Sequence, residues 1–141
     1  MRRLPPRSPY SLIQEDLFPN RWLILVACMM LNCTSRKQVE RVLPSFVSRW
    51  PTPQDFLSAD KNDVAVTCKS LGFANRRTEN IFKMTERFLA GHWSDVRELP
   101  GVGEYAARSY EIFCLGVVGQ TCPKDHALTQ YHEWVTSVPS W

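Results

Sequence analysis

The chain contains Leu99-Pro100-Gly101-Val102-Gly103, followed without a break by a helical pattern from Glu104 to Leu115. Two glycines one residue apart predict a tight turn, because glycine turns without a Cβ penalty and lets the backbone come close to a ligand. The free N–H groups at the start of the following helix form a ready site for an anion such as phosphate. The stretch therefore predicts a phosphate-binding hairpin between two helices, with a plain connecting turn as the alternative.

The rest of the sequence has helical periodicity and no convincing strand. The segment Arg21–Leu31 is apolar almost all round and follows a capping Asn20, which predicts a buried central helix. Other helices are expected at 11–17, from Thr34 or Ser35 through Val47, from Pro53 behind Thr52, from Asp60 to near Gly72, over 75–89, after a capping Ser94, and from Pro123 to about Val135. We therefore predict an all-α, globular fold that is not a simple bundle.

Composition limits the class of protein. With 141 residues, we expect a flexible basic lead-in over 1–9 and a single domain over 10–141. The longest apolar run, Trp22–Leu31, is too short to cross a bilayer, so a soluble intracellular protein without a membrane partner is expected. The five cysteines have neither zinc-ligand nor disulfide spacing, which predicts reduced thiols and no metal site; Cys28, Cys68 and Cys114 are expected as small core residues.

The net charge is +3, and arginine, which favours bidentate phosphate contacts, supplies twelve of the seventeen basic residues. A nucleic acid partner and an ordinary solvated surface both fit this composition.

Several blocks spread from Ser8 to Trp134 together resemble the helix–hairpin–helix DNA glycosylases of the endonuclease III superfamily. Within that superfamily they are most similar to the branch formed by the glycosylase domain of methyl-CpG-binding domain protein four. The blocks are the hairpin with Asp125 twenty residues beyond Tyr105, Ser8-Pro9-Tyr10, Leu12–Phe18, Leu31–Ser35, Leu71-Gly72-Phe73, Ser109–Cys114 and Asp125–Leu128. The resemblance implies two helical lobes with the active site in the cleft between them.

The resemblance also implies a reaction: thymine or uracil opposite guanine, at CpG sites, is flipped out of double-stranded DNA and hydrolysed off. Asp125 is carried over as the catalytic carboxylate, which stabilises the sugar cation and orients water. From the residues alone, Asp125 could equally be an ordinary acid at a helix start. Tyr105 stands where bifunctional relatives carry the Schiff-base lysine, which implies a monofunctional enzyme that leaves an abasic site.

Two side chains are expected to contact the flipped base. Gln14 is carried over as the reader of the pyrimidine imide edge, since an amide offers both a donor and an acceptor. Tyr105 is expected to pack beside the base or hydrogen-bond to it. From the residues alone, Gln14 could be a surface residue and Tyr105 a core aromatic.

Other residues are carried over as DNA contacts. Phe73, after Gly72, falls where the family inserts a wedge beside the estranged guanine; the alternative is that it packs back on the preceding helix. Cys33 replaces an expected arginine finger, so two alternatives stay open: Asn32, Thr34 or Arg36 shares its role, or base flipping is weaker. The remaining expected contacts are Arg76 and Arg77 for phosphates, Gly101, Val102 and Gly103 of the hairpin, and His126; Ala127 replaces a lysine common in the branch.

No cysteine follows Asp125, so no iron–sulfur cluster and no other cofactor is expected, although a monovalent cation at the hairpin stays open. The resemblance implies a monomer in the nucleus, and the Pro- and Arg-rich start suggests a piece of a longer chain. Two other functions stay open: a helix–hairpin–helix module that only binds DNA, and a superfamily glycosylase for another damaged base.

Overall fold

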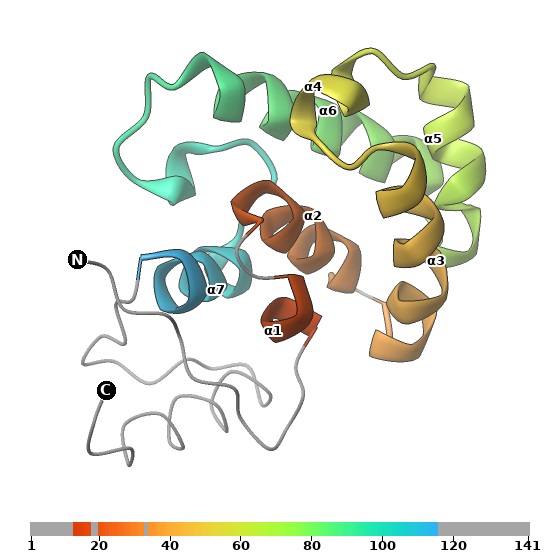
Figure 1. Ribbon diagram of the computed structural model, residues 1–141, viewed down its shortest axis with the longest axis horizontal. Helices are drawn as coiled ribbons and strands as arrows, with labels where there is room; N and C mark the ends of the chain where they lie inside the picture. Colours follow the sequence, from red (N-terminus) through yellow and green to blue (C-terminus); the bar gives the residue numbers. More distant parts are fainter. Residues whose placement is uncertain (1–12, 18–19, 33, 116–141) are drawn as a thin grey trace.

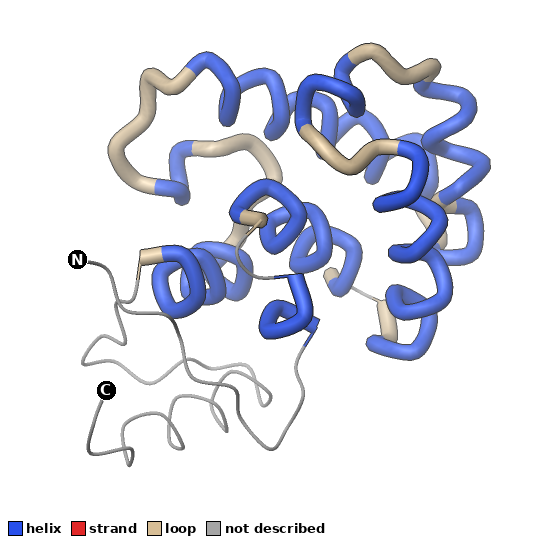
Figure 2. Tube along the Cα trace, viewed as in Figure 1, coloured by secondary structure: helices blue, strands red, loops and turns tan. Residues whose placement is uncertain are grey.

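The computed structural model describes residues 13–17, 20–32 and 34–115 (Figure 1). Within these residues every regular element is a helix, as Figure 2 shows. In chain order they are α1 (Ile13–Leu17), α2 (Arg21–Leu31), α3 (Arg36–Arg49), α4 (Pro53–Leu57), α5 (Lys61–Thr67), η1 (Lys69–Leu71), α6 (Ala74–Ala90), η2 (Val96–Glu98) and α7 (Glu104–Cys114), where η marks a 3-10 turn. The all-α prediction is confirmed; the predicted lead-in and last helix lie outside the described residues.

Helix α2 is the element around which the others pack. All its residues from Trp22 to Met30 are buried, as its almost wholly apolar sequence predicted. It contacts α1 and α7 on one side and α3 and α6 on the other, and α4 and α5 pack against α6 (Figure 1). The helices thus form two groups that share α2.

An aromatic cluster holds α2 to the larger of these groups. Trp22 lies 6.0 Å from Phe46 and 5.6 Å from Phe56 between ring centroids, and Phe56 lies 4.3 Å from Phe82. The buried Trp22 indole N–H has a hydrogen-bond partner, since it donates to Thr85 Oγ1 at 2.9 Å. The cluster therefore fixes α3, α4 and α6 against one face of α2.

Most helix starts follow the predicted caps. The side chains of Asn20, Ser35, Thr52 and Asp60 each accept a backbone N–H from the first turn of α2, α3, α4 and α5. Between Thr34 and Ser35, the structure selects Ser35. The helix predicted from Asp60 is shorter than expected and ends at Thr67, with η1 completing the path to Gly72.

The predicted cap at Ser94 is wrong. Asp95 caps η2 in a capping box, in which its side chain accepts from Arg97 N and Glu98 accepts from Asp95 N. The Ser94 hydroxyl donates to Glu98 and accepts no helix N–H among the described residues.

The cysteines that the structure describes are buried thiols, as predicted. Burial raises the pKa of Cys68 from 9.0 to about 11, against a smaller opposing effect of the Arg77 charge.

We expect Cys68 to resist a thiol reagent at pH 8 until the chain unfolds, as measured by mass spectrometry of the labelled peptides. Because deprotonation is easier in the unfolded chain, the thiol lowers stability only as the pH rises above 9.0. Rapid labelling of Cys68 in folded protein would contradict this burial.

Across the described residues, no helix combines the length and the apolar character that a membrane crossing requires.

Candidate functional site

The hairpin between η2 and α7 is a tight turn packed against the core. Val102 N donates to the Leu99 carbonyl at 3.2 Å, and Leu99 is buried. Gly101 has φ +76, and a Cβ there would lie 2.8 Å from Met29 Cε and 3.5 Å from Asn80 Cβ. Glycine is therefore favoured at this position by the left-handed backbone, while the Met29 side chain would have to shift to make room for a Cβ.

Gly103 serves a different purpose. Its φ of −90 is open to any residue, and a Cβ there would meet no described atom within 4 Å. It is the N-cap of α7, and no side-chain hydrogen bond caps that helix. Of the two expected uses of glycine, the left-handed turn applies to Gly101, whereas Gly103 leaves open space, among the described residues, in front of the α7 N–H groups.

The two glycines therefore predict different effects of alanine on stability. We expect Gly101→Ala to lower the free energy of unfolding by about 1–3 kcal/mol, because alanine is strained in the left-handed backbone conformation of this residue. Gly103→Ala is expected to change it by less than about 0.5 kcal/mol. Urea unfolding of the two variants measures both, and equal losses would contradict the assignment.

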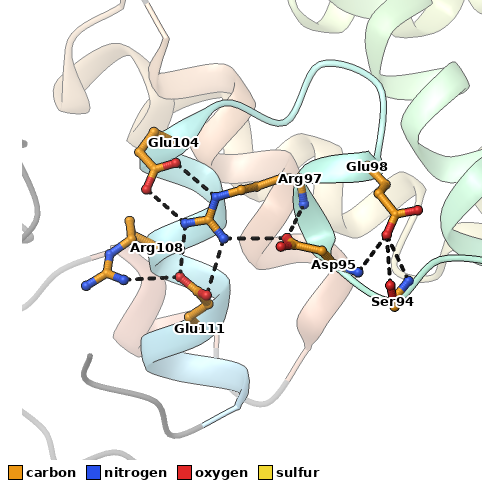
Figure 3. Close-up of polar contacts among 7 residues, drawn as sticks. All are labelled: Ser94, Asp95, Arg97, Glu98, Glu104, Arg108 and Glu111. Carbon is orange, nitrogen blue, oxygen red and sulfur yellow. Dashed lines mark hydrogen bonds and ion pairs between the residues drawn. The ribbon is translucent and has the colours of Figure 1, made fainter. Parts of the chain in front are cut away.

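The outer flank of the hairpin is held by Arg97 of η2 (Figure 3). Its guanidinium donates to both carboxylate oxygens of Glu104, at 2.9 and 2.8 Å, and to both of Glu111, at 3.3 and 3.2 Å. Asp95 lies 3.4 Å away on the η2 side, and Arg108 donates to Glu111 at 3.3 Å. Arg97 thus joins the segments before and after the hairpin.

These contacts shift the pKa values of the groups. Hydrogen bonds from Arg97 lower the pKa of Glu104, and hydrogen bonds to Glu104 and Glu111 raise that of Arg97. Backbone N–H groups of Asp95 and Ser94 lower the pKa of Glu98. Glu98 and Glu104 are therefore ionised at neutral pH and held by these hydrogen bonds.

A cleft of about 760 Å³ lies beside the hairpin. Its walls come from α1, α2, the segment after α2, the start of α6 and the start of α7. It brings together most predicted site residues, namely Gln14, Thr34, Arg36, Phe73, Arg76, Arg77, Gly101, Gly103 and Tyr105. Gly72 and Val102 are their chain neighbours but do not line it, and Cys33, Asp125 and His126 lie outside the described residues.

Gln14 and Tyr105 form a hydrogen-bonded pair at the wall of the cleft. Gln14 is 1% exposed, and its Nε2 donates to Tyr105 Oη at 2.7 Å and to Ser109 Oγ at 3.1 Å. The alternative that Gln14 is a surface residue is wrong. Tyr105 is half-buried and both packs against the core and lines the cleft. Among the described residues Gln14 Oε1 accepts no hydrogen bond, so a carbonyl acceptor stays available beside the cleft.

Phe73 projects from the start of α6. Its side chain is 72% exposed, and its backbone is left-handed with φ 50. A large side chain rarely takes this conformation, which costs about 1–2 kcal/mol. The alternative that Phe73 packs back on the preceding helix is wrong, because the ring lines the cleft.

The hydrogen bonds of Arg77 lie inside the fold, which speaks against its predicted role as a phosphate contact. Arg77 is buried, and its guanidinium donates to the carbonyls of Met29, Met30, Asn32 and Gly72 and to Thr34 Oγ1. These acceptors saturate the guanidinium and turn it away from solvent. The neighbouring Arg76 is exposed at the cleft and keeps the predicted role open.

The hydrogen bond between Thr34 and Arg77 also changes the expected role of Thr34. The Thr34 hydroxyl accepts from Arg77 at 2.6 Å and lies 3.2 Å from the Leu71 carbonyl, to which it donates. Thr34 therefore supports the segment after α2, while Asn32 and Arg36 are exposed at the cleft.

The residue-level prediction missed Met29, Asn80 and Ser109, which support the hairpin and the Gln14–Tyr105 pair. All three lie on predicted helices, and helical spacing placed Ser109 four residues after Tyr105 on the same face of α7. No group of three His, Cys, Asp or Glu side chains that could hold a metal ion occurs within the described residues.

Comparisons with known proteins agree with this geometry. A sequence model of the HhH-GPD superfamily base excision DNA repair proteins matches residues 26–138. A methyl-CpG-binding domain protein 4-like protein of Arabidopsis thaliana is 35% identical over 132 residues, which cover 94% of the chain and 30% of the relative. A thymine-DNA glycosylase of Aeropyrum pernix is 32% identical over 93 residues, covering 61% of the chain and 42% of the relative.

Among solved structures, that of a thermostable thymine-DNA glycosylase superposes with a TM-score of 0.67 at 19% identity, covering 81% of the chain and 54% of the neighbour. The chain thus spans less than half the length of these two sequence relatives. At this identity, the structural likeness shows the fold alone.

Proposed function

Since the chain belongs to the HhH-GPD superfamily of base excision DNA repair proteins, we propose that it is a DNA glycosylase that removes thymine or uracil mispaired with guanine. One observation carries the proposal: a single cleft holds the open start of α7 and the Gln14–Tyr105 pair. The first offers N–H groups to a backbone phosphate, and the second offers polar atoms to a base. The name of one sequence relative, a thymine-DNA glycosylase, favours thymine as a substrate.

The Gln14–Tyr105 pair suits the edge of a flipped thymine or uracil. That edge presents one N–H between two carbonyl oxygens, so the protein must supply an acceptor beside a donor. Gln14 Oε1 supplies the acceptor and the Tyr105 hydroxyl supplies a donor in this proposal. Because Gln14 is held by Tyr105 and Ser109, its amide is oriented before the base arrives.

In the proposed reaction, Asp125 stabilises the positive charge that develops on the deoxyribose and orients the attacking water. The bond between the sugar C1′ and the base nitrogen breaks, and water adds to C1′. The base leaves, and the strand stays intact with an abasic site. The hairpin binds a backbone phosphate, while Phe73 enters the base stack beside the guanine. Cys33 is shorter than an arginine, so we assign filling of the vacated gap to Asn32 and Arg36.

A single-turnover assay on labelled duplexes tests the proposed function. Duplexes carrying G·T, G·U, A·T, A·U or G·C pairs are incubated with excess protein, and alkali then converts abasic sites into strand breaks. We expect product from G·T and G·U and far less from the paired controls. The absence of product from both mispaired duplexes, with duplex binding retained, would instead favour a module that only binds DNA.

Tyr105 predicts the absence of strand cleavage. A phenol cannot form the Schiff base that β-elimination requires, so borohydride should trap no covalent adduct with DNA. Tyr105→Lys places an amine at the same point of the cleft and serves as the positive control, in which a trapped adduct is expected. An adduct in the wild-type protein would mean that another amine carries out lyase chemistry.

A further inference from the structure

Arg77 carries a buried positive charge whose hydrogen-bond partners, where the structure records them, are all uncharged. Nε donates to the Gly72 carbonyl at 2.8 Å, Nη1 to those of Met29 and Met30 at 3.1 and 3.2 Å, and Nη2 to the Asn32 carbonyl at 2.6 Å. Burying a charge against neutral acceptors is costly, and only the rigid five-donor fork of arginine serves so many acceptors at once. The arrangement therefore points to a structural role that only a guanidinium group, with its five N–H donors, can fulfil.

The acceptors belong to segments that are far apart in the sequence. Two lie at the end of α2, two are Asn32 and Thr34 after that helix, and two are Leu71 and Gly72 in the turn before Phe73. Thr34 adds a direct bridge, since it accepts from Arg77 at 2.6 Å and donates to the Leu71 carbonyl at 3.2 Å. Arg77 thus joins two segments that both contribute to the cleft.

Arg77 also holds the strained start of α6. Its side chain binds the carbonyl of Gly72, and its backbone N–H donates to the carbonyl of Phe73 at 2.9 Å. The left-handed conformation of Phe73 is therefore fixed through the carbonyls on both sides of its own Cα. No side chain caps α6 among the described residues, so these two bonds define how the ring projects.

We propose that Arg77 is a positioning residue, which fixes Phe73 relative to the 32–34 segment and thereby sets the discrimination between a pyrimidine opposite guanine and one opposite adenine. The inference rests on the proposed function. In the proposed function Phe73 reaches the opposite base while Asn32, one of the acceptors of Arg77, helps to fill the gap left by the flipped nucleotide, and both contacts form only at one spacing. A displacement of about 1 Å is enough to cost about 10²-fold in rate.

Two variants weaken this connection in different ways. Arg77→Lys keeps the charge but loses the fork, and Thr34→Val removes the bridging hydroxyl while leaving Arg77 in place. Thr85→Val is the matched control, because it breaks the buried hydrogen bond from Trp22 without touching the cleft. We expect both Arg77→Lys and Thr34→Val to lower the ratio of single-turnover excision rates, G·U over A·U, by about 10-fold or more. Thr85→Val is expected to keep the wild-type ratio despite its lower stability.

Amide hydrogen exchange provides a second readout that does not depend on activity. We expect faster exchange at Asn32, Thr34, Gly72 and Phe73 in Arg77→Lys, with the Thr85→Val control unchanged there. Wild-type rate ratios in both variants, or unchanged exchange, would overturn the positioning role while leaving the proposed function intact. If the wild type excises nothing, the proposed function fails, and unchanged exchange would then reject the connection between the segments as well. If Arg77→Lys does not fold, Thr34→Val alone decides.

Discussion

Replacing Asp125 by asparagine is expected to lower the single-turnover excision rate by about 10²- to 10⁴-fold while binding of a G·T duplex is retained. Asparagine keeps the shape of the side chain and removes the negative charge that stabilises the sugar cation. Asp125 lies outside the described residues, so the expectation comes from the sequence resemblance and the proposed reaction. Rates on G·T and G·U duplexes and a binding titration measure the two effects separately.

Asp63→Asn is the matched control for this substitution. Asp63 is an exposed acid of α5, and its ion pair with Arg49, at 3.8 Å, is away from the cleft. Excision should be unchanged in this variant. Unchanged excision in Asp125→Asn would remove Asp125 from the mechanism and would leave the fold and the family untouched.

Replacing Arg77 by methionine is expected to lower the free energy of unfolding by about 3 kcal/mol or more, because each buried acceptor that loses its donor costs about 1–3 kcal/mol. Methionine fills similar space but leaves the carbonyls of Met29, Met30, Asn32 and Gly72 without the Arg77 donors. Urea unfolding followed by tryptophan fluorescence measures the loss.

Arg76→Met is the control, because Arg76 is the exposed neighbour of Arg77 on the same helix. Its stability is expected to stay within about 0.5 kcal/mol of the wild type. Its binding to duplex DNA should weaken, with the slope of log affinity against log salt reduced by about one. A stability loss in Arg76→Met as large as in Arg77→Met would contradict the different roles of the two arginines.

These two arginines show what the sequence can and cannot predict. Adjacent residues on a helix point about 100° apart, and the letters alone do not say which of them faces the core. The bias towards arginine suggested phosphate contacts for both. Only the packing of α6 against the end of α2 turns Arg77 inward and leaves Arg76 in solvent.

Predictions that depend on local chemistry agree well with the structure. The caps at Asn20 and Asp60 and the turn at Gly101 follow from backbone groups within a few residues. Residue roles that depend on contacts with distant parts of the chain could not be predicted from the local sequence. The burial of Gln14 requires α7 to lie beside α1, and the close approach at Gly101 requires Met29 and Asn80.

The position of α2 between the two groups of helices has a mechanical consequence. Helix α2 is buried from Trp22 to Met30, and three of its residues, Cys28, Met29 and Leu31, line the cleft. Within the described residues, each group packs on its own side of α2, so a rotation of either group about this helix would break that packing. In the proposed complex, the DNA duplex therefore has to undergo most of the deformation. It must bend and open for the flipped nucleotide to enter the cleft.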